Sequence, residues 1–253
     1  GLALPDELLP RDQSGRVATR SQSRGSVWQN TKDGLSGLRM VLSSDVMSLA
    51  FRQGRKTFLP HNRAWRRAVA ANIKAFSSEK RAWAASDAVD FSPNRARYDE
   101  MGIDLPTPDN YDMAAQEEAF LHGSSMTARA VQRLPLVKRA ERGAAAFMKV
   151  LRAGMADDII SMYTDAQWKM MSPEDKQAWG KIINAGTGRG TLPEIAKSSA
   201  QGLNTIFYST RNNIANVQVP ATMFFGRNNA IRKEAAKLYV SDLLVKWTIR
   251  GLW

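Results

Sequence analysis

The stretch that decides the fold spans residues 136–163 and reads LVKRAERGAAAFMKVLRAGMADDIISMY. Its apolar residues recur at intervals of three or four, which is the spacing of one face of an α-helix. The pattern predicts one long helix after Pro135, with the apolar face in a core and the charged residues on the solvent side. The apolar positions are Val137, Ala140, Ala144, Phe147, Met148, Leu151, Met155, Ile159 and Met162; the charged ones are Lys138, Arg139, Arg142, Lys149 and Arg152.

Small residues keep part of this helix thin. Gly143, Gly154 and the alanines 144–146 and 153 lie in its middle, so another backbone can approach closely. In a membrane such residues mark helix pairing, but the charges of this stretch exclude a hydrocarbon environment. No run of roughly 18 apolar residues occurs anywhere in the sequence. We therefore expect the close packing to occur in a core in water.

The same periodicity occurs on both sides of the central stretch. After Pro60, Trp65, Val69, Ile73 and Phe76 fall on one stripe and predict a helix with this face in the core. Ser92 followed by Pro93 predicts the start of a short helix that ends at Met101. Ser172, Pro173, Glu174 and Asp175 predict another helix start, with the end near Gly186. Residues 228–250 predict a long amphipathic terminal helix, with Ile231, Ala235, Leu238, Leu243 and Trp247 on its apolar side.

Strand signals are scarce, because alternating Val, Ile and Thr runs with hairpin turns are missing. The sequence therefore predicts an all-α fold, a multi-helix elongated bundle of roughly eight to ten helices with an extended N-terminal arm. We divide the chain into an arm at 1–34, an N-terminal helical region at 35–134, a central helical region at 135–225 and a basic amphipathic helix at 226–253. Within the central region we expect Pro220 to interrupt a helix and residues 223–225, Met-Phe-Phe, to form an apolar plug.

Charge and composition narrow the function classes. The net charge of +12 in 253 residues favours acidic partners such as nucleic acid, anionic lipid or an acidic protein. The absence of cysteine excludes disulfides, thiolate metal sites and cysteine nucleophiles. Since Gly1 stands where an initiator Met would, we expect a piece of a longer chain.

Three features of the sequence are candidate functional sites. The acidic section 101–135, which includes Asp104 and Glu118, is interpreted as a solvated linker and helix start rather than a cation site or an acid–base pair, since its spacing matches no calcium loop. The loop GTGRGT at 186–191 lacks the sequence context of nucleotide-binding loops and is interpreted as a turn between helices. His61 and His122 are the only imidazoles, and no motif places either near a nucleophile. We therefore predict no catalytic residues, no metal and no cofactor.

Several landmarks resemble a module of large polyvalent phage proteins, which include internal virion or DNA-ejection proteins of short-tailed phages. They keep their order over roughly residues 40–215. The matching stretches are 44–49, 52–54, 64–65, 76–79, 102–105, 134–135, 139–142, 147–152, 184–190, 203–204 and 207–211. The resemblance implies a helical structural component of a phage particle, found in the virion interior and later in the host cell envelope. The implied partners are further copies of the chain, other virion proteins such as the portal, packaged double-stranded DNA and the host envelope.

Two sets of residues are predicted to serve these contacts. A basic face for nucleic acid or a partner consists of Arg63, Arg66, Arg67, Lys74, Arg232, Lys233, Lys237 and Lys246. Packing within an oligomer is assigned to Trp28, Val137, Phe147, Leu151 and Trp247. The leading hypothesis is an oligomer at the portal or a conduit for genome delivery, whose apolar helix stripes are covered by sister subunits. The alternatives are a DNA-binding module that does not read sequence, and an enzyme domain acting on cell wall or nucleic acid, for which substitution of Glu118 or Glu174 should abolish turnover.

Overall fold

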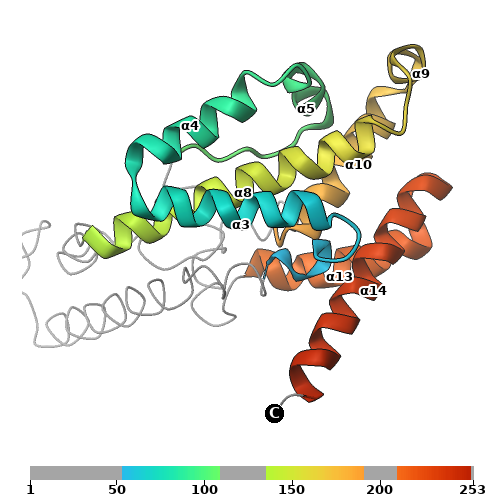
Figure 1. The fold of residues 1–253 in the computed structure, drawn as a ribbon. Helices are drawn as coiled ribbons and strands as arrows, with labels where there is room; N and C mark the ends of the chain where they lie inside the picture. Colours follow the sequence, from blue (N-terminus) through green and yellow to red (C-terminus); the bar gives the residue numbers. More distant parts are fainter. Residues whose placement is uncertain (1–52, 109–134, 191–209, 252–253) are drawn as a thin grey trace, which may run out of the picture.

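The structure, a computed structural model, describes residues 53–108, 135–190 and 210–251 (Figure 1). These residues form eight α-helices and one short 3-10 helix, with no strand among them, which confirms the predicted all-α class. The predicted arm 1–34, with Trp28, lies outside the described residues. The elements are η2 Gly54–Thr57, α3 Asn62–Ser77, α4 Glu79–Asp90, α5 Arg95–Met101, α8 Pro135–Ile160, α9 Asp165–Met170, α10 Pro173–Gly186, α13 Thr210–Phe225 and α14 Asn229–Gly251.

Helix α8 is the centre of the arrangement, as its apolar period predicts. Helices α3 and α4 both pack against α8 and against each other, and in Figure 1 α3 runs alongside it. At the other end of the fold, α10 packs against α5, α13 and α14. Most of the buried apolar side chains, including Phe147, Leu151, Trp179 and Leu238, belong to one hydrophobic cluster. That cluster draws residues from all three ranges 35–134, 135–225 and 226–253.

The contact between α3 and α8 depends on small residues, which confirms the predicted close approach. A methyl group on Gly154 would lie 2.6 Å from Cβ of Ala64, and one on Gly143 would lie 2.6 Å from Oδ1 of Asn72. The face of α3 that meets α8 is consequently an alanine face. Its buried residues are Ala64, Ala68, Ala71, Asn72 and Ala75.

The predicted core stripe of α3 was therefore wrong in part. Trp65, Val69 and Phe76 are only partly buried, and Ile73 is exposed. The physical reason is the short distance between the two helix backbones, which leaves room for methyl groups but not for large side chains. The prediction from sequence used hydrophobicity alone, which favours the larger apolar residues as the buried ones.

Capping signals predicted the start of α10 correctly and misplaced the start of α5. Helix α10 begins as predicted: Oγ of Ser172 accepts a hydrogen bond from the backbone N–H of Asp175 at 3.2 Å, and Pro173 occupies the first turn. Helix α5 begins two residues after Pro93, because Asn94 is its N-cap and Oγ of Ser92 accepts the N–H of Asn94 instead.

The expectation for residues 220–225 was wrong. Helix α13 continues through Pro220, and Phe224 and Phe225 are exposed rather than forming a plug. Proline removes one helical N–H, yet Ala215 and Val219 before Pro220 are buried in the core cluster, and Met223 after it packs against that cluster. Packing against α10 and α14 therefore holds the helix where the local signal predicts a break.

Candidate functional site

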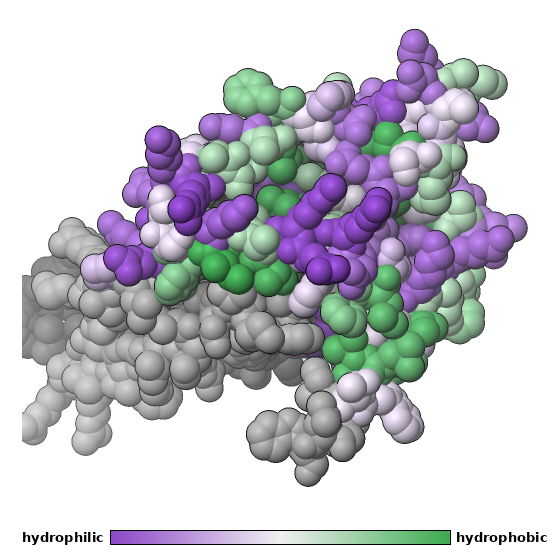
Figure 2. Space-filling model, viewed as in Figure 1, coloured by the Kyte–Doolittle hydropathy of each residue, from purple (hydrophilic) through white to green (hydrophobic). Residues whose placement is uncertain are grey.

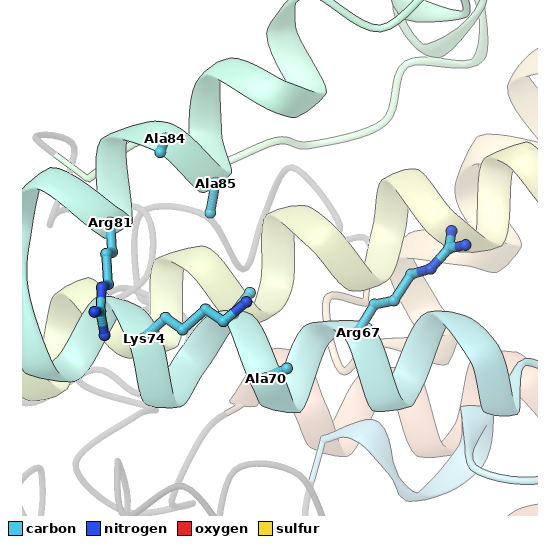
Figure 3. Close-up of a pocket in the computed structure, with 7 residues that line it drawn as sticks. Arg67, Ala70, Lys74, Arg81, Ala84 and Ala85 are labelled. Atoms are coloured by element: carbon cyan, nitrogen blue, oxygen red, sulfur yellow. The ribbon is translucent and has the colours of Figure 1, made fainter.

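A basic groove lies between α3 and α4. It has a volume of about 660 Å³ and is lined by three cations and four alanines: Arg67, Ala70, Ala71 and Lys74 from α3, and Arg81, Ala84 and Ala85 from α4. Figure 3 shows the cationic side chains in a row along α3, with Arg81 at one end, Lys74 in the middle and Arg67 at the other end. The alanines are short, so they leave the space between the two helices open.

The cations of this groove have no acidic partner among the described residues. Arg67, Lys74 and Arg81 are exposed, and none of their charged side chains forms an ion pair or hydrogen bond with the described part of the chain. The sequence of α3 contains four basic residues and no acidic one. Since unpaired positive charges repel one another, this surface is electrostatically suited to an anion.

The groove therefore contains only two of the residues of the predicted basic face. Arg67 and Lys74 line the groove, and Arg63 and Arg66 are exposed on the same helix. Arg81 was missed by sequence reasoning. The available signal was the Lys80-Arg81 pair at the start of α4, directly after the turn that returns the chain from α3.

The basic residues predicted on α14 are in a different electrostatic situation. Lys237 donates to Glu234 at 3.2 Å, and Lys246 donates to Asp242 at 2.5 Å. Nε of Arg232 donates to the carbonyl oxygen of Gly226 at 2.7 Å. Lys237 and Lys246 therefore have carboxylate partners on α14 itself, whereas Lys233 is exposed with no carboxylate partner among the described residues.

An apolar surface accompanies these paired charges. Val240, Leu244 and Trp247 are exposed on one side of α14, and Trp247 is 76% exposed. Leu59 is exposed too, and its backbone N–H donates to Oγ of Ser241 at 3.3 Å, which places it beside this helix. Figure 2 shows hydrophobic surface gathered over α14. We call Leu59, Val240, Leu244 and Trp247 the α14 apolar patch.

The core contains a histidine clamped by two carboxylates. Nδ1 of His61 lies 2.7 Å from Oδ2 of Asp158, and Nε2 lies 2.8 Å from Oε1 of Glu234. Burial by itself lowers the pKa of His61, but the two hydrogen bonds outweigh it and raise the pKa above its ordinary value. Burial likewise opposes ionisation of Glu234, yet the His61 partner lowers the pKa of that carboxyl. Both ring nitrogens are thus engaged, and the cluster joins the start of α3 to α8 and α14.

Two cations of α8 are buried, so their predicted place on the solvent side was wrong. Arg152 is fully buried: Nε donates to Oγ1 of Thr187 at 2.8 Å and an Nη donates to the carbonyl oxygen of Asp104 at 2.7 Å. Nζ of Lys149 donates to Ser86 and to Asp90, each at 2.6 Å. Periodicity does not separate a solvated cation from one that meets its partners on another helix.

A third buried cation sits at η2. Burial lowers the pKa of Lys56 to about 7, although Asp242 acts in the opposite direction. Its Nζ donates to the carbonyl oxygen of Ala185 at 3.4 Å. Asp242 itself forms ion pairs with Arg55 and Lys246, and these outweigh the effect of burial and lower the pKa of Asp242.

The remaining candidate site residues from the sequence do not come together at one described site. Glu174 is exposed and lies 3.8 Å from Arg227, whereas Glu118, His122 and the side chain of Val137 are not described. Asp104 forms ion pairs with Arg152 and Arg189, so it is not part of a solvated linker. After α10, Gly188 has a left-handed φ of 87°, as expected for a turn.

Among the described residues, no group of His, Asp or Glu side chains is arranged to hold a metal ion. None of the described helices is long and apolar enough to cross a membrane. No protein-family model, curated protein or solved structure matches the chain. The arguments about function consequently start from the groove, the α14 apolar patch and the buried ionic clusters.

Proposed function

We propose that this chain is a structural, non-catalytic module of a phage particle protein, and that copies associate through the α14 apolar patch. The observation that carries the proposal is the exposure of Val240, Leu244 and Trp247 along one side of a helix whose other side is buried in the core. Clustered apolar surface of this kind typically marks a protein contact. A central tryptophan is a common energetic anchor of such contacts.

The charge around the patch favours a second copy as the occupant. The net charge of +12 opposes self-association. At α14, however, Lys237 and Lys246 are paired with Glu234 and Asp242 of the same chain, so two copies can approach there with less repulsion than at α3. One patch can also pair with itself about a two-fold axis, which needs no second kind of surface.

The structure places Phe147 and Leu151, which were predicted to make oligomer contacts, in the core of the chain. Both side chains are fully buried by the chain itself, so they cannot contact a sister subunit in this conformation. Of the five residues predicted for oligomer packing, Trp247 is exposed, and Trp28 and the Val137 side chain are not described. Self-association through Trp247 is consequently the form of the oligomer hypothesis that fits the described residues.

The ionisable groups support a structural role over an enzymatic one. His61 and Arg152 are buried, and each donates or accepts hydrogen bonds with groups outside its own helix. Buried charges that are paired in this way can fix the relative positions of helices. The phage setting rests on the resemblance to internal virion proteins. It implies the particle interior and contacts with the portal, and is tested by locating this chain in images of the particle that contains it.

The association is tested by sedimentation velocity at increasing protein concentration. The mean mass should rise with concentration for the wild type, whereas the double variant Leu244→Ser, Trp247→Ser should remain a monomer. Phe91→Ser, Met170→Ser is the matched control, because both residues are at least as exposed as Trp247 but lie outside the patch, after α4 and at the end of α9. A wild-type protein that stays monomeric at the highest concentration would overturn the proposal.

A further inference from the structure

We infer that the groove between α3 and α4 binds the phosphodiester backbone of double-stranded DNA without reading its sequence. The first argument is the state of its charges. Arg67, Lys74 and Arg81 come from two helices to line one open space, and no described carboxylate neutralises them. Elsewhere in the described fold, cations such as Lys149, Arg152 and Lys246 are paired. Exposed lysines such as Lys169 and Lys181 lie on separate helices, so the groove differs from them in bringing three charges to one open space.

The second argument is shape. The cations form a row along α3 rather than converging on one point (Figure 3). Arg67 and Lys74 are seven residues apart, which is about 10 Å along a helix. One DNA strand presents a phosphate about every 3.4 Å along the duplex axis. A row of this length matches a few successive phosphates better than a single small anion.

The third argument is what the groove lacks. Its lining consists of the three cations and four alanines, with no aromatic ring and no Asn or Gln side chain. Proteins that bind single strands stack bases on aromatic side chains, and adenine in a duplex is read by Asn or Gln amides. The lining contains neither an aromatic ring nor such an amide. The lining therefore favours a charged backbone as ligand, and the duplex as its form.

The neighbouring charges extend the same surface. Arg63 and Arg66 are exposed on α3, and Lys80 is exposed beside Arg81 on α4. Glu79 is the acidic residue nearest in sequence, and its carboxylate lies 3.6 Å from Arg142 of α8. The groove thus lies within a wider region of positive potential, which steers a polyanion towards it.

The test measures binding of a fluorescently labelled 30-base-pair duplex by anisotropy at several salt concentrations. The triple variant Arg67→Ala, Lys74→Ala, Arg81→Ala should lose at least tenfold in affinity. The slope of log K against log salt should become shallower by about 2 to 3, since each neutralised phosphate contributes about 0.9. Arg81→Ala alone should reduce that slope by about one.

A matched control removes the same charge elsewhere. Lys169→Ala, Lys181→Ala, Arg227→Ala takes three exposed cations from α9, α10 and the segment between α13 and α14, and should leave the slope unchanged. If the two triple variants lost the same affinity for DNA, the loss would come from net charge and not from the groove, and the inference would be overturned. So would an unchanged affinity in the groove variant. Circular dichroism checks that both variants keep their helices.

Three further probes separate the sources of phosphate. Inorganic phosphate at constant ionic strength should not displace the duplex, and displacement would indicate a small-anion site instead. Oligo(dT) should bind no more tightly than the duplex; tighter binding that depends on the three cations would overturn the choice of double-stranded DNA. Vesicles containing phosphatidylglycerol should not bind more tightly than DNA through these residues. The groove and the α14 apolar patch are separate surfaces, so this inference can fail while the proposed self-association holds.

Discussion

Nε2 of His61 and Oε1 of Glu234 lie 2.8 Å apart although 173 residues separate them in the chain. The same imidazole reaches Asp158 through Nδ1 at 2.7 Å. The side chain of His61 thereby fixes the start of α3 relative to the end of α8 and to α14. The α14 apolar patch is carried by the last of these helices, so the cluster holds the proposed contact surface in place.

Replacing His61 with alanine should lower the free energy of unfolding by about 3 to 5 kcal/mol, because Glu234 would remain buried with only Lys237 as an ionic partner. Urea unfolding followed by circular dichroism measures the change. The double variant His61→Leu, Glu234→Leu should lose less than His61→Ala alone, since it leaves no charge stranded. A double variant that is as unstable as the sum of the single ones would contradict this coupling.

The pH dependence of this cluster has a defined sign. The raised pKa of His61 means that its contribution is full below the ordinary histidine pKa and is lost as the pH rises through the folded value. The lowered pKa of Glu234 means that its contribution is lost as the pH falls through that lowered value. The stability difference between wild type and His61→Ala should therefore be largest between the ordinary glutamate pKa and the ordinary histidine pKa. Unfolding curves across this pH range measure it.

Lys56→Met should stabilise the protein at pH 7, by on the order of 1 to 4 kcal/mol. The folded pKa of about 7 lies far below the ordinary lysine value, so folding opposes the charged form. Asp242 would still be paired with Arg55 and Lys246. The gain should shrink as the pH rises above 7, because the folded protein then holds neutral Lys56 and the cost of removing the proton falls until the unfolded state loses it near the ordinary lysine pKa of 10.5.

Thermal unfolding as a function of pH checks the Lys56 prediction. Lys181→Met is the control, since Lys181 is exposed on α10 and should show no such pH-dependent gain. A Lys56→Met protein that is less stable than the wild type at pH 7 would show that the hydrogen bond to Ala185 outweighs the cost of burial.

Arg152→Lys should cost about 2 to 4 kcal/mol although it keeps the charge. The guanidinium of Arg152 contacts Thr187 and Asp104 from different nitrogens, and a single ammonium cannot satisfy both partners. Arg139→Lys, at an exposed position of the same helix, should change the stability by less than about 0.5 kcal/mol. Chemical denaturation of the two variants side by side provides the measurement.

Gly154→Ala should destabilise by about 1 to 3 kcal/mol, because the added methyl group would lie 2.6 Å from Cβ of Ala64 and would force α3 and α8 apart. Gly102→Ala provides a contrast: nothing lies within 4 Å of the new methyl group, but the φ of 66° strains an alanine by about 1 kcal/mol. Differential scanning calorimetry distinguishes the two. A Gly154→Ala variant as stable as the wild type would mean that the helices separate at little cost.

Much of the local structure follows from the sequence because its causes are local. The apolar period after Pro135 predicts α8, and the Ser172-Pro173 cap predicts the start of α10. The Gly and Ala positions of α8 also predict the close approach that Ala64 and Gly154 make. Periodicity and capping act within a few residues of the chain, so they can be read without knowing what packs against the helix.

Tertiary structure decided which face of α3 is buried, whether Pro220 ends a helix and which cations are paired. Lys149 and Arg152 were assigned to solvent from their position on α8, but their partners come from residues 86–104 and 187. Arg81 joins Arg67 and Lys74 only because α4 turns back along α3. The energy of a charge depends on the burial and partners that distant segments supply, whereas the tendency to form a helix depends on neighbours in sequence. The sequence by itself therefore determined that this protein is helical and basic, and the tertiary structure decided which of its charges are left for a ligand.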